Sequence, residues 1–127
     1  MSNYYKTCLL IDDNYIDNFV TRRILEGGSF AEKVIVSQSA GDAINSLKAG
    51  TVKPDVIFLD IRMPLMGGFE FLQEFDKLEL ENKSDIKIFM LSSSLDPADL
   101  KKSANNKYIT QFIHKPLTQK TLDDICA

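Results

Sequence analysis

The sequence is poor in cysteine and histidine and has no long apolar run. Two cysteines, Cys8 and Cys126, and one histidine, His114, are too few for a disulfide framework or a histidine-based zinc site. No apolar run approaches the roughly 18 residues that a membrane-spanning helix requires, and the first residues lack the pattern of a signal peptide. We therefore expect a protein of the reducing cytoplasm that does not enter a membrane.

The chain also lacks a strong charge of either sign. Its net charge is −3, and this mild acidic balance gives no basic footprint for nucleic acid. With 44% hydrophobic and 26% charged residues, the composition is that of a globular protein. The 127 residues leave no room for a second domain of usual size. We expect a single domain over residues 1–127, without an output domain of its own.

Short apolar runs alternate with longer amphipathic stretches along the chain. Most of the runs are nearly continuous and rich in branched residues, which is typical of strands covered on both faces. They occupy residues 7–11, 34–36, 56–59, 86–91 and 111–113. The pattern predicts an α/β fold with a five-stranded parallel sheet and helices on both of its faces.

The amphipathic stretches predict the intervening helices. Ser39, Asp96 followed by Pro97, and Thr118 are expected to cap helix starts, and Gly27-Gly28 and Gly50 are expected helix ends. Apolar residues at helical spacing within these stretches are expected to pack into the core. They are Ile16, Phe19, Val20 and Ile24; Ala40, Ala43, Ile44 and Leu47; Phe71, Leu72, Phe75 and Leu78; and Leu122 and Ile125.

Polar groups follow four of the five predicted strands. Asp12-Asp13 end the first, Asp60 the third and Ser92-Ser93-Ser94 the fourth, and Lys115 follows the fifth. Because parallel sheets place ligands beyond the carboxyl ends of their strands, these groups should meet at one edge. An oxygen-only carboxylate cluster suits Mg²⁺, which could leave one carboxylate free as a nucleophile toward phosphorus.

These residues and their order resemble the receiver domain of two-component response regulators over essentially the whole chain. The motifs that carry the resemblance are Leu10–Asn14, Ile57–Pro64, Gly67–Gly68, Met90–Ser92 and Lys115–Pro116. The resemblance implies a flavodoxin-like, doubly wound sheet with the strand order 2-1-3-4-5.

The resemblance also implies a role for each residue of the acidic edge. Asp60 would accept the phosphoryl group, and Lys115 would pair with a phosphoryl oxygen. Asp13 would bind Mg²⁺ directly, and Asp12 directly or through water. With Asp60, the backbone carbonyl of Arg62 would complete the protein ligands of the metal.

Further residues would act as a switch or contact partners. Ser92 matches the hydroxyl that turns toward the phosphoryl group, and Phe112 matches the switch aromatic. The Lys115–Pro116 bond would be cis, which is accessible mainly before proline. The positions that dock the phosphodonor in the family correspond to Ile16, Asp17, Val20 and Pro116.

The sequence departs from the family pattern at several positions. Phe112 lacks a phenolic hydroxyl, and Gly67 stands where an acidic residue is common. The polar segment 93–106 fits the family's fourth helix loosely. Arg62 and Ser94 occupy two variable positions that, in the family, tune hydrolysis of the phosphoryl group.

The resulting hypothesis is a signalling module that takes a phosphoryl group from a histidine kinase or a histidine phosphotransfer protein and then contacts a downstream protein. It would not be a turnover enzyme. One alternative is a Mg²⁺-dependent aspartyl-phosphate phosphatase, although Arg62 stands where that family has a second aspartate. A flavin mononucleotide binder is disfavoured because Asp12-Asp13 would repel the phosphate. A third alternative is a receiver-like scaffold that is never phosphorylated.

Overall fold

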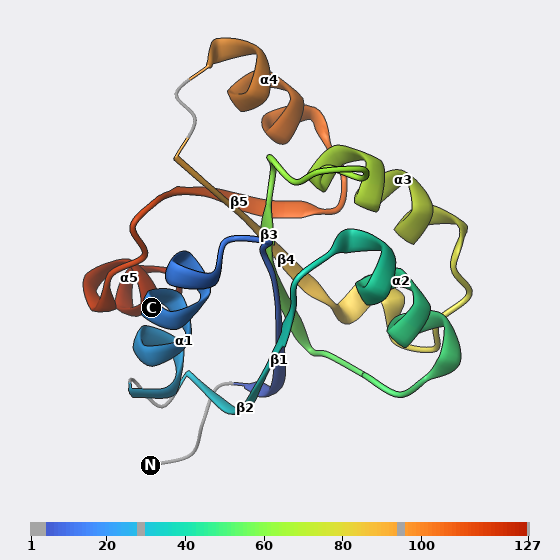
Figure 1. Ribbon diagram of the computed structural model, residues 1–127, viewed down its shortest axis with the longest axis horizontal. Helices are drawn as coiled ribbons and strands as arrows, with labels where there is room; N and C mark the ends of the chain where they lie inside the picture. The colour runs from blue at the N-terminus through green and yellow to red at the C-terminus, as the bar shows by residue number, and fades with distance from the viewer. Residues whose placement is uncertain (1–4, 28–29, 94–95, 127) are drawn as a thin grey trace.

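The protein is built on one five-stranded parallel sheet, as a computed structural model shows for residues 5–27, 30–93 and 96–126 (Figure 1). The strands are β1 (Tyr5–Ile11), β2 (Ala31–Ser37), β3 (Val56–Asp60), β4 (Lys87–Ser92) and β5 (Ile109–His114). Their spatial order is β2-β1-β3-β4-β5, and every neighbouring pair is parallel. The predicted strand order 2-1-3-4-5 is therefore confirmed.

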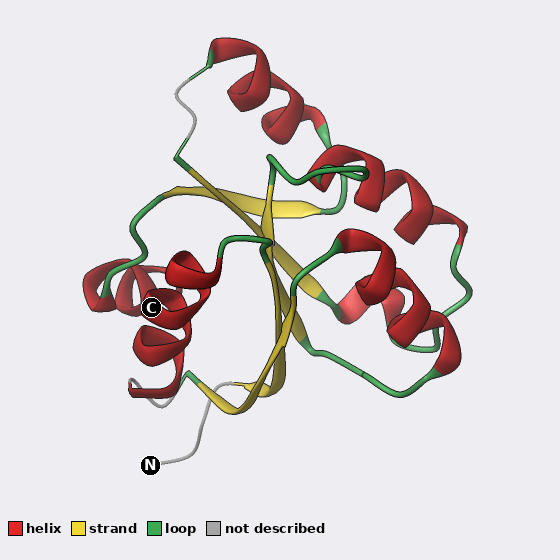
Figure 2. Cartoon of the chain, viewed as in Figure 1, coloured by secondary structure: helices red, strands yellow, loops and turns green. Residues whose placement is uncertain are grey.

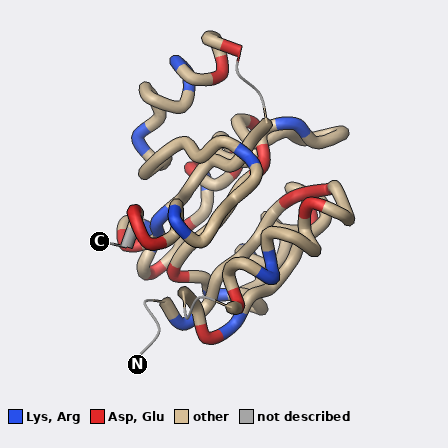
Figure 3. Tube along the Cα trace, turned by 90° about the vertical axis from the view of Figure 1, so that its left-hand side faces the viewer, with Lys and Arg blue, Asp and Glu red and all other residues tan. Residues whose placement is uncertain are grey.

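Helices cover both faces of the sheet (Figure 2). They are α1 (Tyr15–Gly27), α2 (Ala40–Ala49), α3 (Gly68–Lys77), α4 (Pro97–Asn105) and α5 (Gln119–Cys126), with a short 3₁₀ turn η1 (Lys83–Asp85). α1 and α5 lie on one face, whereas α2 and α3 lie on the other and α4 stands beyond α3 (Figure 1). None of the helices described is long and apolar enough to cross a membrane. Acidic and basic positions are interspersed along the trace (Figure 3).

Two apolar clusters fill the space between the sheet and its helices. Leu25 of α1 and Leu122 of α5 pack with alternate strand residues such as Phe58 on one face. Ala43, Leu47, Phe71 and Phe75 pack on the other face with strand residues such as Leu9, Ile57 and Met90. Because successive strand residues point to opposite faces, the continuous apolar runs serve both clusters.

Hydrogen bonds confirm the predicted helix ends at Ser39, Gly50, Asp96 and Thr118, and Gly27 is the last residue of α1, whereas Gly28 lies outside the described residues. The Ser39 side chain accepts a hydrogen bond from the Asp42 backbone N–H, and the Asp96 side chain accepts one from Ala98. Thr118 Oγ1 accepts from the Thr121 N–H at 3.2 Å. Gly50, with φ of 76°, ends α2 in the left-handed conformation that glycine adopts without strain.

The apolar stripe of α1 does not lie where the spacing predicted it. Ile16, Phe19 and Val20 are 71%, 57% and 44% exposed, so the expectation that they pack into the core is wrong. The buried residues of α1 are instead Asn18, Thr21 and Leu25. Asn18 Nδ2 donates to the Asp12 carbonyl at 2.8 Å, and this bond turns the polar side of α1 toward the end of β1.

Candidate functional site

Three carboxylates meet at the carboxyl edge of the two central strands. Asp12 and Asp13 follow β1, and Asp60 ends β3, which is hydrogen-bonded to β1. One carboxylate oxygen from each residue lies within 4.8 Å of the others. Asp12 is 1% exposed and Asp60 is also buried, whereas Asp13 faces solvent. The sequence prediction that these residues converge is therefore confirmed.

Lys115 is the cation of this carboxylate cluster. Its Nζ lies 2.8 Å from both Asp12 Oδ2 and Asp17 Oδ2, and 3.6 Å from Asp60 Oδ1. The Lys115 backbone N–H donates to the Ser92 carbonyl at 2.8 Å, which ties the chain after β5 to the end of β4. The Lys115–Pro116 bond is cis, as the resemblance implied.

The pKa values of Asp60 and Lys115 are shifted from their ordinary values by their surroundings. Burial, followed by the neighbouring Asp12 charge, raises the pKa of Asp60 to about 6 despite the opposing charge of Lys115. Burial lowers the pKa of Lys115, but hydrogen bonds to Asp12 and Asp17 and the Asp60 charge outweigh it and raise the pKa to about 12. Lys115 is therefore a permanent cation, whereas Asp60 is close to accepting a proton in mildly acidic solution.

Local hydrogen bonds fix the position of Asp12. Its Oδ1 accepts from the Asn14 backbone N–H at 2.9 Å, and its carbonyl accepts from Asn18. These two bonds leave Oδ2 directed to Lys115. Asn18 was not predicted from the sequence, because a buried asparagine inside a helical pattern resembles any other polar position.

The loop after Asp60 packs tightly against the backbone of β3. The Gly68 N–H donates to the Ile61 carbonyl at 2.8 Å. A Cβ atom at Gly68 would lie only 2.5 Å from the Asp60 carbonyl oxygen, so no other residue fits there without moving the acidic edge. Gly67 precedes α3 without a side-chain cap, in line with the missing acidic residue.

The remaining predicted site residues lie around this cluster. Ser92 is buried at the end of β4, one residue beyond Leu91, the register partner of Asp60. Phe112 of β5 is partly buried against the cluster under α2 and α3. The Arg62 side chain turns away toward α4. Ser94 lies outside the described residues.

The predicted docking residues form part of one rim of the site. Ile16, Val20 and Pro116 are exposed, whereas Asp17 reaches inward to Lys115. The sequence did not predict this contact, because Asp17 and Lys115 lie 98 residues apart. Phe19 is a further exposed apolar residue on the same helix.

The donor set fits a magnesium ion. It contains three carboxylates and no nitrogen or sulfur ligand, and hard divalent cations prefer oxygen. The three carboxylates lie close together, and Lys115 pairs with two of them, Asp12 and Asp60, so a bound cation would relieve the remaining repulsion.

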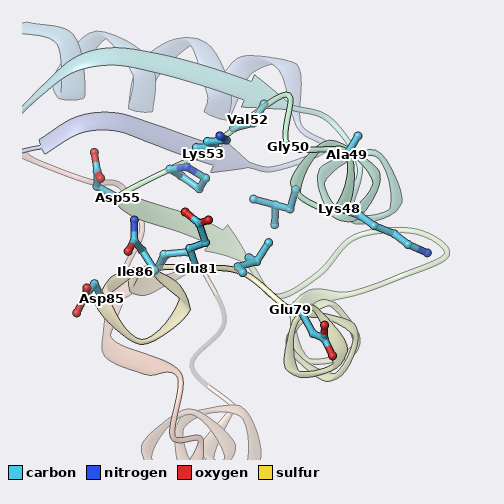
Figure 4. A pocket seen from close by; sticks show the side chains of 14 residues that line it. Lys48, Ala49, Gly50, Val52, Lys53, Asp55, Glu79, Glu81, Asp85 and Ile86 are labelled. Carbon is cyan, nitrogen blue, oxygen red and sulfur yellow. The ribbon is translucent and has the colours of Figure 1, made fainter.

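A cavity of about 310 Å³ at the opposite end of the sheet does not belong to this site. It lies between the loop after α2 and the loop before β4 (Figure 4). Asp55 in its wall already accepts hydrogen bonds from the Lys6 and Thr7 backbone N–H groups, both at 3.0 Å. Asp55 therefore ties the residue before β3 to the first residues of β1.

The sequence matches a family model described as the response regulator receiver domain over residues 8–127. A protein-glutamate methylesterase/protein-glutamine glutaminase of Clostridium acetobutylicum is 30% identical over 91% of this chain, but the match covers 31% of that protein. An uncharacterized response regulatory protein of Vibrio cholerae is 29% identical over 94% of this chain and 56% of its own length. The chain thus spans about a third to a half of these curated relatives.

Solved structures show the same fold over nearly the whole chain. A two-component response regulator from Cytophaga hutchinsonii superposes with a TM-score of 0.86 and 32% identity, covering 96% of this chain and 94% of that one. A response regulator receiver protein from Dyadobacter fermentans gives a TM-score of 0.83 and 31% identity, covering 94% of each chain.

Proposed function

The chain belongs to the response regulator receiver domain family, and on that premise we propose that it accepts a phosphoryl group from a partner phosphohistidine on Asp60. The observation that carries this proposal is the convergence of Asp60 with Asp12, Asp13 and Lys115 at one edge of the sheet. Asp60 ends the central strand β3, and it lies next to both the Asp12–Asp13 carboxylates and the Lys115 ammonium group.

The transfer is a displacement at phosphorus. An ionised Asp60 oxygen attacks the phosphorus atom, the new O–P bond forms, and the P–N bond to the donor imidazole breaks. The electron pair of that bond returns to the imidazole. Lys115 lies 3.6 Å from Asp60, so its ammonium group is placed to neutralise a phosphoryl oxygen, and Ser92 would donate to another.

Mg²⁺ would be held by Asp12, Asp13, Asp60 and the carbonyl of Arg62, and would supply charge neutralisation for the phosphoryl oxygens. Lys115 lies within 3.6 Å of carboxylate oxygens of Asp12, Asp17 and Asp60 and limits the repulsion among them. The reaction would modify Asp60 of the chain itself. We therefore propose a signalling protein that is phosphorylated, without catalytic turnover of a separate substrate.

The partners would be a histidine kinase or histidine phosphotransfer protein as donor and a downstream protein as target. The donor would dock on Ile16, Asp17, Val20 and Pro116. Ser92 and Phe112 would transmit the change, because an added charge of about −1.5 to −2 biases a two-state surface. We propose that this exchange takes place in the cytoplasm, since two cysteines without a disulfide framework favour a reducing compartment.

The direct test is incubation with a small phosphodonor and Mg²⁺, followed by intact mass measurement. We expect the wild type to gain one phosphoryl group in the presence of Mg²⁺ and none when the metal is chelated. Asp60→Asn should gain none, while Asp123→Asn, an exposed change on α5, should behave as the wild type. An adduct that persists in Asp60→Asn would refute the proposal.

The exposed α1 face provides a separate prediction about the protein donor. Ile16→Ala and Val20→Ala should change the free energy of unfolding by about 0.5 kcal/mol or less, because both side chains are already in solvent. Transfer from a histidine phosphotransfer protein that modifies the wild type should slow by about tenfold or more. Stopped-flow transfer kinetics measure this.

Labelling by the small phosphodonor serves as the control for these α1 variants and should be unchanged, because that reaction needs no docking surface. Equal slowing of both reactions would show that α1 affects the chemistry and does not dock the donor.

A further inference from the structure

α4 has an unusually polar attachment to the rest of the molecule. Its buried residues are Asp99 and Ser103, and within Pro97–Asn105 no apolar side chain is buried. The Ser103 hydroxyl is buried without a hydrogen-bond partner in the described structure. Since tertiary packing of an apolar face supplies most helical stability in proteins, α4 depends on other contacts to stay in place.

A cavity separates α4 from the loop that follows Asp60. It has a volume of about 390 Å³ and is lined by that loop, the first turns of α3, and Asp99 and Lys102 of α4. Figure 1 shows α4 beyond α3, at the end of the sheet where β5 lies. Close-packed interiors resist movement, whereas a helix beside an open space has room to shift.

A short ion pair crosses this gap. Arg62 Nη2 donates to Asp99 Oδ2 at 2.6 Å, and Asp96 lies farther away at 3.9 Å. The Asp99 carboxylate is 10% exposed, so its ionised form needs a nearby partner of opposite charge. Lys102 Nζ lies 5.3 Å from the Phe69 ring centre, a weaker contact between α4 and α3.

Resting on the proposed function, we propose that the Arg62–Asp99 ion pair is a latch that holds α4 in the unphosphorylated protein and is released by phosphorylation. Arg62 lies two residues after Asp60, so its guanidinium is fixed to α4 while its backbone belongs to the acceptor loop. A phosphoryl group on Asp60 adds about −1.5 to −2 charges next to this loop, and this charge attracts the guanidinium and weakens its pairing with Asp99. Release frees α4 to move into the cavity.

Arg62 and Asp99 are positioning residues in this account, since neither side chain touches the reacting atoms. The latch makes the position of α4 depend on the acceptor loop, and such coupling is reciprocal. Loosening α4 must therefore also loosen the loop that includes Met63, Leu65 and Met66.

The first arm of the test uses no ligand. Amide hydrogen exchange in α4 should accelerate about tenfold or more in Asp99→Asn, the scale set by a lost charged hydrogen bond. Exchange at Leu65 and Met66 should accelerate as well, which a purely local role in α4 would not cause. The double variant Arg62→Gln/Asp99→Asn should exchange no faster than Asp99→Asn, because the two residues act as a pair.

Glu26→Gln is the matched control, since it breaks an exposed arginine–carboxylate pair, Arg22–Glu26, elsewhere on the molecule. It should leave α4 unchanged. An α4 exchange rate in Asp99→Asn equal to that of the wild type would overturn the latch. So would a double variant in which the effects of the two substitutions on α4 exchange simply add.

The second arm adds a small phosphodonor and Mg²⁺. The adduct should form on both wild type and Asp99→Asn, and α4 exchange should accelerate in the wild type but hardly change in the variant. A wild type that takes the adduct without any change in α4 would overturn release by phosphorylation. A wild type that takes no adduct would refute the proposed function instead, and the first arm would still decide whether the ion pair holds α4.

Discussion

Replacing Lys115 with methionine is expected to lower the free energy of unfolding by about 3 to 5 kcal/mol at neutral pH in metal-free buffer. Methionine keeps the apolar stem but removes the ammonium group, whose Nζ lies within 3.6 Å of Asp12, Asp17 and Asp60. Asp12 and Asp60 are buried, so their ionised carboxylates would lose a counter-ion that water cannot replace. Urea denaturation at pH 7.5 with a chelator measures the loss.

Two comparisons separate this electrostatic effect from a packing defect. Lys120→Met, an exposed change on α5, should leave the stability unchanged. The double variant Asp12→Asn/Lys115→Met should recover most of the loss, because it removes the charge that Lys115→Met leaves unpaired. A double variant no more stable than Lys115→Met would show that the lysine acts through packing alone.

The strand ends could be predicted from the sequence because they depend on local pattern. Continuous apolar runs followed directly by Asp12, Asp60 and Ser92 fix both the strands and their polar ends, and a parallel sheet brings such ends together. The cap at Ser39 and the glycine at Gly50 follow equally local rules.

The orientation of α1 could not be predicted in this way. Apolar spacing identifies a helix and its apolar side, but the side that faces the sheet is decided by tertiary contacts. Here the buried side contains Asn18 and Thr21, and Asn18 bonds the Asp12 carbonyl. The apolar side with Ile16 and Val20 is exposed, and the proposed donor would dock on these two residues.

The Arg62–Asp99 pair was equally hidden from the sequence. Its members are separated by 37 residues, and each is unremarkable by itself, an arginine in a loop and an aspartate in the first turn of a helix. Their contact indicates a role for the pair in holding α4 because α4 lies across a cavity from the loop that contains Arg62.

In metal-free buffer, the stability of the wild type should fall as the pH rises from about 4 to about 7, by on the order of 3 kcal/mol from Asp60 alone. The folded-state pKa of Asp60 is about 6, against an ordinary value of 3.8. Below the lower value both states are protonated and Asp60 has no effect. Above the higher value Asp60 is ionised in both states, and its burial and its repulsion by Asp12 raise the free energy of the folded state. Each pH unit between the two pKa values is worth about 1.4 kcal/mol.

Asp60→Asn isolates this contribution, because every other titrating group is present in both proteins. The difference in free energy of unfolding between variant and wild type should be small at pH 4 and favour the variant by about 3 kcal/mol at pH 7.5. Saturating Mg²⁺ should remove most of this difference, since it binds the ionised acidic cluster of the folded wild type and stabilises that state. Chemical denaturation at several pH values, with chelator or Mg²⁺, measures each difference. Parallel curves for the two proteins would mean that the Asp60 carboxylate is neither strained by burial nor coupled to Asp12.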